Sequence, residues 1–414
     1  MGLMRTPFLV PGRWLRLLAP AAAGLMAAGL LGAAPANAAG SMTPGVPAAV
    51  RAPAVGGRVV TRSVLASLNA TTTDDSLLGV SCPAARACTA VGTTKGDGTG
   101  ARLAKAWNGS SWRVQAVPGD GFLFDVSCTS ARACTAVGQT GPGKPLTDRW
   151  NGTTWVNPRH NPGALFSRLT GVSCTSATRC IAVGHTGGGP LAERWNGTTW
   201  ALQTVPIPAS FFHPGLNDVS CTSASACVAV GFYITDDDNH LPLAATWDGT
   251  TWTVQATPPV SDLSSLGSVS CTSASACIAV GTTPVGGNEI PTPLAEAWNG
   301  VAWTILPVPD PAGNGSLNGV SCSSATACTA VGSASSGPLA ERWNGMKWAV
   351  QPTPAATGAI LDSVSCSSAT ACTAVGEVSP SVNASGNHVT LAERWNGTTW
   401  VIQPTPGNPA APPR

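Results

Sequence analysis

Charged side chains are scarce in this sequence: Asp, Glu, Lys and Arg make up 10% of the 414 residues, and the formal net charge is +2. Tyrosine occurs once, histidine five times and phenylalanine seven times. Proteins that bind nucleic acid through its phosphates usually present clustered Lys and Arg residues. The chain contains no such cluster. We therefore expect no nucleic-acid partner, and a surface built mainly from Ser, Thr, Asn, Gly and Ala.

Common catalytic motifs are missing as well. The sequence has no G-x-S-x-G segment, which presents a serine nucleophile, and no H-E-x-x-H segment, which binds a catalytic zinc ion. We therefore expect no catalytic residues, no metal and no cofactor, and we favour a non-enzyme over an enzyme.

The chain consists largely of one segment repeated seven times. The clearest copy spans residues 169–206 and reads LTGVSCTSATRCIAVGHTGGGPLAERWNGTTWALQTVP. Each copy contains L-x-x-V-S-C, then C-x-A-V-G, then a variable loop into L-[AT]-x-x-W, and finally [ND]-G-x-x-W. The copies follow one another every 44 to 51 residues, a period typical of propellers and of helical arrays. Short Val-, Thr- and Trp-rich runs bounded by turn residues favour strands, four per repeat.

A single four-stranded sheet cannot cover both of its faces, whereas seven sheets around an axis bury one another. The sequence therefore predicts an all-β fold, a seven-bladed β-propeller with four antiparallel strands per blade. The third and fourth strands should be joined at Trp195-Asn196-Gly197-Thr198-Thr199-Trp200, because Asn and Gly tolerate the positive φ of tight turns. The two Trp would then pack as a cross-strand pair in the blade core.

All fourteen cysteines fall into C-x5-C pairs, one per repeat. Each pair spans the turn between the first two strands, which brings the two Cβ atoms toward disulfide range. Each closed loop should stabilise the fold by about 2 kcal/mol. Zinc binding is the alternative, but seven separate two-ligand hairpins do not make tetrahedral sites. The predicted disulfides join Cys82–Cys88, Cys128–Cys134, Cys174–Cys180, Cys221–Cys227, Cys271–Cys277, Cys322–Cys328 and Cys366–Cys372.

The order L-x-x-V, A-V-G and turn-G-x-x-W resembles that of the Asp-box (BNR-type) β-propellers, which include sialidases, sortilin-like receptors and Ycf48-like photosystem assembly factors. It also resembles secreted repeat proteins of high-GC Gram-positive bacteria. An Asp box carries Asp two residues before its Gly, where this chain carries Trp, as in Trp195 before Gly197. The resemblance spans all seven repeats and implies a propeller fold.

The first 38 residues are typical of a secretory signal peptide. Three arginines lead into the uncharged apolar stretch 17–34, and Ala36-Asn37-Ala38 fits a cleavage site. An uncleaved membrane anchor is the alternative, because the stretch approaches spanning length. We expect a secreted protein, extracellular or attached to the cell wall, with no membrane span after cleavage. The predicted parts are 1–38 signal peptide, 39–76 Pro/Ala/Gly-rich linker with a candidate additional strand over 58–66, 77–406 propeller and 407–414 disordered tail.

The repeats differ mainly in two connections, the one between the second and third strands and the one between blades. In an up-and-down blade both connections emerge on the same face of the ring, and loops on a rigid scaffold often bind ligands. The rare aromatic and histidine side chains gather in these loops, most densely in repeats three and four. The predicted ligand-binding residues are His185, Phe211, Phe212, His213, Phe232, Tyr233, Asp236, Asp238 and His240.

Two alternatives apply to these candidates. Phe211 and Phe212 would otherwise fill space between blades, and the run from Asp236 to Asn239 would be a solvated turn. That run offers oxygen ligands for Ca²⁺ but lacks the spacing of an EF-hand loop. A further charged set lies at one position of the third strand, where we expect Glu/Arg pairs within or between blades rather than a catalytic carboxylate pair. Its members are Lys105, Asp148, Glu193, Glu296, Glu341 and Glu393, with Arg149, Arg194, Arg342 and Arg394 following four of them.

Three functions follow from these features. The first is a secreted, non-catalytic binding or scaffolding propeller, monomeric, that engages an extracellular protein or glycan through its variable loops. The second is a sialidase-like glycoside hydrolase or lyase, which would need an arginine cluster, tyrosine and acids in the central funnel. The single tyrosine, Tyr233, lies in a peripheral insertion. The third is a purely structural protein of the cell envelope, without a concentrated surface patch.

Overall fold

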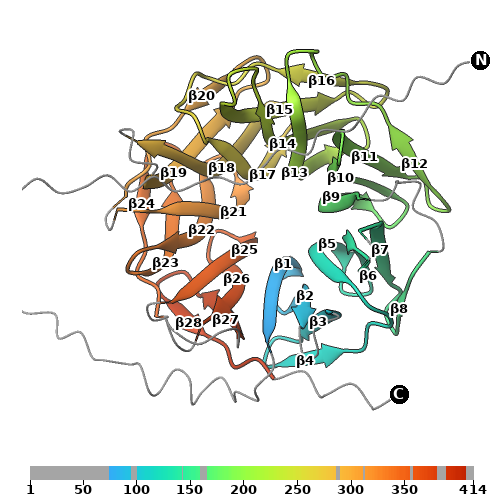
Figure 1. Cartoon of the computed structure of the whole chain (residues 1–414). Coiled ribbons are helices and arrows are strands. Elements are labelled where there is room, and N and C mark those ends of the chain that lie inside the picture. The colour runs from blue at the N-terminus through green and yellow to red at the C-terminus, as the bar shows by residue number, and fades with distance from the viewer. Residues whose placement is uncertain are drawn as a thin grey trace, which may run out of the picture. The chain divides into compact units, whose positions relative to one another are not determined.

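A computed structural model describes residues 74–94, 100–141, 143–158, 166–285, 290–310, 313–354, 358–379 and 388–406. Its 28 strands form seven four-stranded antiparallel sheets, arranged as a ring of blades (Figure 1). Every blade uses four consecutive strands, so the ring closes without a strand borrowed from the other end of the chain. The predicted seven-bladed propeller is confirmed. The expected signal peptide, the additional strand over 58–66 and the tail lie outside the described residues.

The blades follow the chain in order, and β1 begins two residues before the predicted start of the propeller at residue 77. The strands of blades 1 to 4 are β1 Asp75–Ala84, β2 Ala87–Thr94, β3 Ala101–Trp107, β4 Trp112–Gln115; β5 Phe122–Ser130, β6 Ala133–Gln139, β7 Pro145–Trp150, β8 Trp155–Val156; β9 Arg168–Ser176, β10 Arg179–Thr186, β11 Gly189–Trp195, β12 Trp200–Gln203; β13 Phe212–Ser223, β14 Ala226–Ile234, β15 His240–Trp247 and β16 Trp252–Gln255. Those of blades 5 to 7 are β17 Ser265–Ser273, β18 Ala276–Val285, β19 Ile290–Trp298, β20 Trp303–Ile305; β21 Ser316–Ser324, β22 Ala327–Ala334, β23 Gly337–Trp343, β24 Trp348–Val350; β25 Ala359–Ser368, β26 Ala371–Val378, β27 Val389–Trp395 and β28 Trp400–Ile402. No helix in the described part of the chain is long and apolar enough to cross a membrane.

The repeated Leu and Val of the first strand form the core between blades; Leu77 and Val80, for example, are buried. Between them lies a β-bulge, seen as a register shift against the second strand. The bulge brings a carbonyl oxygen very close to the Gly of A-V-G: a Cβ on Gly92 would lie 1.9 Å from the Ser76 oxygen. The equivalent glycine is equally crowded in all seven repeats, which explains why no other residue occupies it.

Both predicted pairings within the blade are confirmed. The seven C-x5-C disulfides are formed, and no free cysteine remains among the described residues. The two Trp of every repeat face each other across the third and fourth strands, with ring centroids 5.5–5.8 Å apart. The turn between them differs from expectation in one respect. Only Gly197 adopts positive φ, at 104°, whereas Asn196 accepts hydrogen bonds at Oδ1 from the backbone N–H groups of Thr198 and Thr199.

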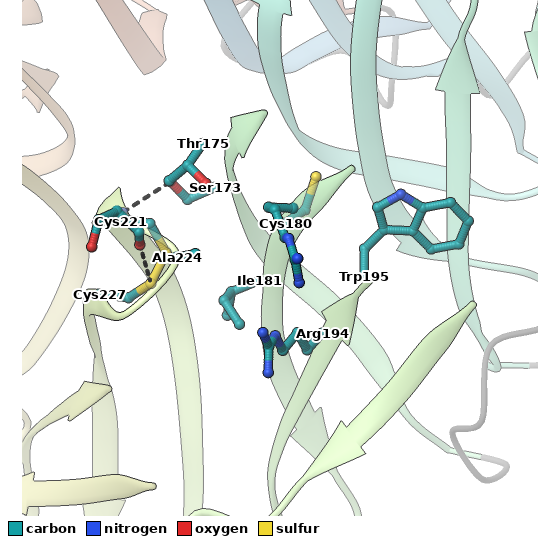
Figure 2. Close-up of a pocket in the computed structure, with 11 residues that line it drawn as sticks. Ser173, Thr175, Cys180, Ile181, Arg194, Trp195, Cys221, Ala224 and Cys227 are labelled. Atoms are coloured by element: carbon teal, nitrogen blue, oxygen red, sulfur yellow. Dashed lines mark hydrogen bonds between the residues drawn. A yellow bond between two sulfur atoms is a disulfide. The ribbon is translucent and has the colours of Figure 1, made fainter. Parts of the chain in front are cut away.

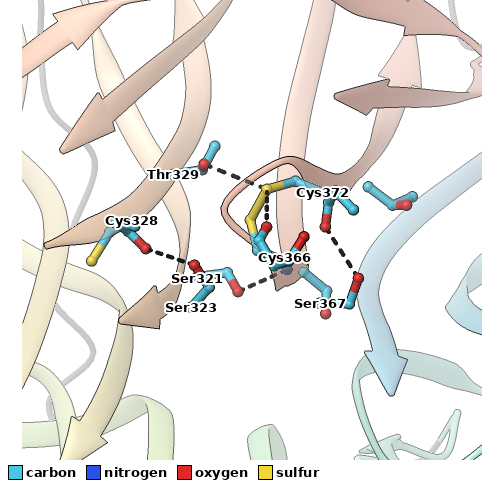
Figure 3. The surroundings of a disulfide bond; sticks show 12 residues. Ser321, Ser323, Cys328, Thr329, Cys366, Ser367 and Cys372 are labelled. Atoms are coloured by element: carbon cyan, nitrogen blue, oxygen red, sulfur yellow. Dashed lines mark hydrogen bonds between the residues drawn. A yellow bond between two sulfur atoms is a disulfide. The ribbon is translucent and has the colours of Figure 1, made fainter. Parts of the chain in front are cut away.

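Adjacent blades are joined by a ring of side-chain hydrogen bonds that the sequence analysis did not predict. The Ser of V-S-C accepts a hydrogen bond from the backbone N–H of the first Cys in the next blade, and Figure 3 shows this for Ser321 and Cys366. All seven interfaces have the bond, at 2.9–3.0 Å: Cys82 to Ser365, Cys128 to Ser81, Cys174 to Ser127, Cys221 to Ser173, Cys271 to Ser220, Cys322 to Ser270 and Cys366 to Ser321.

The ring has two faces that differ in the connections they carry. The turn face carries the seven turns inside the C-x5-C pairs and the seven turns between paired Trp. The loop face carries the connections between second and third strands and those between blades. Because the blades are antiparallel and consecutive, the variable segments all lie on the loop face.

Replacing one serine of the ring tests its contribution to stability. In Ser220→Ala the Cys271 N–H loses its acceptor, which should cost about 1–3 kcal/mol because a shielded donor is left unpaired. Urea denaturation followed by tryptophan fluorescence should show a lower midpoint. Ser210→Ala, which changes an exposed serine outside the strands, is the control. Equal midpoints for both variants would show that the ring bond contributes nothing.

Candidate binding site

The loop face between blades 3 and 4 carries a group of stacked aromatic side chains. Phe211 lies just before β13, and its ring stacks on that of Tyr233 from β14, with centroids 3.6 Å apart and planes 10° apart. Both rings pack against the core cluster shared by blades 3 and 4. Burial raises the pKa of the Tyr233 hydroxyl above its ordinary value. Phe211 and Tyr233 therefore form a fixed base under the loops.

An open hollow of about 820 Å³ lies beside this base. Phe212 borders it and is 46% exposed. The next residue, His213, has φ of 42°, in the left-handed region. The hollow is lined by Thr186, Gly188, Gly189 and Pro190 of blade 3, by Val205, Ile207, Pro208 and Ala209 of the connection, and by Phe211, Phe212, His213 and Pro214.

Three more of the predicted residues lie around this hollow or on the adjoining part of blade 4. The Cβ of His185 and the ring of Phe232 both approach Gly215, so the two side chains flank the same point of β13. Burial, and then the charge of Arg168, lower the pKa of His185, which therefore favours the neutral imidazole. The Phe232 ring stacks parallel to that of His240, with centroids 6.5 Å apart.

The two predicted aspartates lie apart from the aromatic group. Asp236 and Asp238 are exposed in the turn between β14 and β15, and neither lines the hollow. The turn is closed by hydrogen bonds from Asp238 N–H to the Thr235 carbonyl and from Thr235 N–H to the Asn239 carbonyl. The described residues contain no group of three or more His, Cys, Asp or Glu that could hold a metal ion. This geometry favours the solvated turn over a calcium loop.

The charged set on the third strand is buried. Glu341 is fully buried, and its carboxyl oxygens have no hydrogen-bond partner among the described residues, whereas Arg342 lies 5.7 Å from the Trp395 ring centroid. The two adjacent side chains point to opposite sides of the strand, so they cannot pair. Asp148 does form an ion pair, at 3.0 Å, but with Arg102 of blade 1 instead of the adjacent Arg149. Lys105, Glu193, Glu296 and Glu393 are buried as well.

Burial shifts these glutamates toward their neutral form. It raises the pKa of Glu296 to about 7 and that of Glu193 to about 8. The pKa of Glu341 also rises to about 8, from burial and then from the charge of Asp310. Each of these carboxyls lies on the third strand of a different blade.

Two aspartates of the first strand were not among the predicted residues. Asp125 Oδ2 accepts the N–H of Val172 in blade 3 at 2.8 Å, and Asp218 Oδ2 accepts the N–H of Val269 in blade 5 at 2.9 Å. Burial, and then the charge of Asp218, raise the pKa of Asp125 to about 8. Both carboxyls thus bridge blades two residues away from the serine ring. The signal in the sequence is the residue before V-S-C, which alternates among Gly, Asp and Ser.

One Ser–His–acid group occurs where blades 7 and 1 meet. Glu377 accepts a hydrogen bond from the Ser76 hydroxyl, and its other oxygen lies 3.0 Å from Nδ1 of His388. The carboxylate therefore stands between the serine and the histidine. A nucleophilic triad needs the histidine in the middle, where it takes the serine proton. This group does not support the hydrolase alternative.

The groups required by a sialidase-like site are also dispersed. Tyr233 stacks on Phe211 on the loop face, whereas Arg149, Arg342 and Arg394 each lie over a Trp ring of the following blade. These arginines and the tyrosine therefore do not converge on one site.

Comparisons with known proteins identify the fold. No family model and no curated protein matches the chain. Ycf48 from Cyanidioschyzon merolae is 16% identical with a TM-score of 0.53, over 78% of this chain and 96% of Ycf48. U3-55K is 11% identical with a TM-score of 0.53, over 78% and 97% of the two chains. The GH74 xyloglucanase from Xanthomonas campestris is 12% identical with a TM-score of 0.54, over 80% of this chain and 55% of the enzyme. These likenesses confirm the expected Ycf48-like propeller and, at such low identity, show the fold alone.

The buried glutamates predict how stability depends on pH. Because folding raises the pKa of Glu296 from 4.5 to about 7, its stabilising contribution is complete below pH 4.5 and lost as the pH rises through about 7. Glu296→Gln keeps the shape without titrating. The variant should be more stable than the parent by about 1–3 kcal/mol at pH 8 and nearly equal at pH 4.

Thermal unfolding of the two proteins across this pH range checks the result. Asp237→Asn removes one charge from an exposed turn and is the control, for which no such pH-dependent gain is expected. If the stability difference between Glu296→Gln and the parent favoured the variant less at pH 8 than at pH 4, the result would contradict a neutral Glu296 carboxyl.

Proposed function

We propose that this chain is a secreted, non-catalytic, monomeric binding propeller that holds an extracellular protein or glycan in the hollow between blades 3 and 4. The observation that carries the proposal is the exposed Phe212 beside a hollow of about 820 Å³, with the Phe211–Tyr233 stack fixed next to it. Ligand sites in proteins commonly measure about 300–1,000 Å³, a range that includes this hollow. A partly exposed ring on a rigid base can stack on a sugar ring or receive an apolar side chain.

The polar groups around the hollow support a ligand that is not charged. The described side chains lining it include no Asp, Glu, Lys or Arg, and His185 at its edge favours the neutral state. Backbone groups of Gly188 and Gly189 lie in its wall without side chains in front of them. Such a surface is better suited to hydroxyl groups or a neutral peptide than to phosphate or nucleic acid.

Export is supported by the cysteines. Disulfides persist in oxidising compartments and are rare in the cytosol, and this chain forms seven without a free thiol among the described residues. The pattern of residues 1–38 agrees with secretion. The purely structural alternative predicts no concentrated patch, whereas the exposed aromatic ring and the hollow lie together between two particular blades.

A binding screen with matched variants tests the proposal. A glycan array and a pull-down from the extracellular medium would identify the ligand of the mature protein. Phe212→Ala should then weaken binding at least about tenfold, because hot-spot aromatic residues dominate such interfaces. Phe166→Ala is the matched control, since Phe166 is 79% exposed and does not line the hollow.

Both variants should keep the melting temperature of the parent protein. Equal binding by the parent and by Phe212→Ala would contradict the site. Turnover of a chromogenic glycoside that Tyr233→Phe abolishes would instead establish the enzyme alternative.

A further inference from the structure

The turn face carries a repeated contact between arginine and tryptophan of neighbouring blades. Arg149 of blade 2 lies over the Trp195 ring of blade 3, with Cζ 4.6 Å from the ring centroid. The Arg149 guanidinium also donates a hydrogen bond to the Ala177 carbonyl of blade 3. Arg394 of blade 7 repeats both contacts, with the Trp107 ring at 5.5 Å and the Ala85 carbonyl. Arg342 of blade 6 lies over Trp395 of blade 7 at 5.7 Å. Each is the residue that follows the buried acid of the third strand.

The groove between blades 3 and 4 shows what this arginine does to the space between blades. Arg194 lines that groove together with Trp195 of its own blade and the Cys221–Cys227 disulfide of the next (Figure 2). The free volume remaining there is about 10 Å³. The arginine side chain therefore fills the groove.

The next two grooves have the same walls but lack the arginine. Thr246 and Ala297 stand at its position in blades 4 and 5. The grooves there hold about 250 Å³ and about 190 Å³. The first is lined by Trp298 and Ala274 of blade 5, and the second by Trp343 and Ala325 of blade 6. These volumes are below those of usual small-molecule sites but suit a single side chain.

The acceptor carbonyls are in place as well. The Ala274 carbonyl accepts the Nε1–H of Trp298, and the Ala325 carbonyl that of Trp343, both at 3.2 Å. In blades 1 and 3 the equivalent carbonyls accept an arginine instead, and the Nε1 atoms of Trp107 and Trp195 have no partner among the described residues. A carbonyl has two lone pairs, so a guanidinium can join or replace the indole N–H.

We propose that the grooves between blades 4 and 5 and between blades 5 and 6 each bind an arginine side chain of a partner peptide. At other interfaces the chain's own arginine occupies this position, whereas in these two grooves no arginine of the chain does. Asp248 adds charge complementarity, because it lines the first groove where the other six repeats carry Asn. Arginine is preferred to lysine since its planar guanidinium can stack on the indole and donate to a carbonyl at once. The proposal concerns the turn face and is independent of the hollow on the loop face.

The test follows indole N–H signals by NMR while a blocked Gly-Arg-Gly peptide is added to the folded protein. Signals of Trp298 and Trp343 should shift and saturate, whereas those of Trp107 and Trp195, already covered by Arg394 and Arg149, should stay in place. A peptide with neutral citrulline instead of arginine should bind about five- to tenfold more weakly, and the lysine peptide should also be weaker.

Two variants close the grooves with residues the chain already uses elsewhere. Thr246→Arg should abolish the Trp298 shift and leave the Trp343 shift, and Ala297→Arg should do the reverse. Leu202→Arg adds the same charge on an exposed strand of blade 3 and should change neither. Asp248→Asn should weaken binding at the first groove only, more at low salt than at high salt.

Melting temperatures of the two groove variants should be at least equal to that of the parent, since four interfaces already contain this arginine. The proposal is overturned by an absence of shifts at saturating peptide, by equal binding of the citrulline peptide, or by shifts that persist in Thr246→Arg and Ala297→Arg.

Discussion

The hydrogen bond from a cysteine N–H to a serine hydroxyl of the preceding blade is the contact on which the ring depends. It occurs at every interface, including the one that joins the last blade to the first. The donor belongs to a residue whose side chain is fixed by the disulfide, so the N–H has little freedom to move away from its acceptor. The first strands of neighbouring blades are therefore held at the same spacing all around the ring. The rest of each blade can then vary without changing how the blades meet.

Two kinds of variation use this constant frame. On the loop face the connections differ in length and content, and between blades 3 and 4 they place Phe212 beside a hollow. On the turn face the backbone hardly varies, and a single position of the third strand decides whether a groove is filled by arginine or left open. In every repeat that has an acid before that position, the acid is buried. Burying a carboxyl away from water lowers the free energy of unfolding.

Much of the fold could be predicted because the repeat supplies its own comparison. Six similar spacings between seven repeats, paired cysteines and paired tryptophans each point to the same four-stranded unit. The serine of V-S-C was not recognised as a bridge, since its partner lies in the next repeat and nothing within one blade requires it. The burial of Glu341 and the position of Arg342 over Trp395 were missed for the same reason, because strand alternation gives the side of a strand but not the neighbour that covers it. The stack of Phe211 on Tyr233 was not predicted, because it needs two loops to meet, which composition alone does not determine.

Amide hydrogen exchange on protein labelled with ¹⁵N only at cysteine tests the central contact most directly. The label leaves one signal for each of the seven ring donors and one for each of their disulfide partners. If the serine ring holds the blades together, the seven donor amides exchange slowly and at similar rates, and Ser365→Ala at the junction of blades 7 and 1 accelerates the exchange of Cys82 above all. Donor amides that exchange as fast as exposed turn amides in the parent protein would show that the bonds do not persist in solution and that another contact holds the ring.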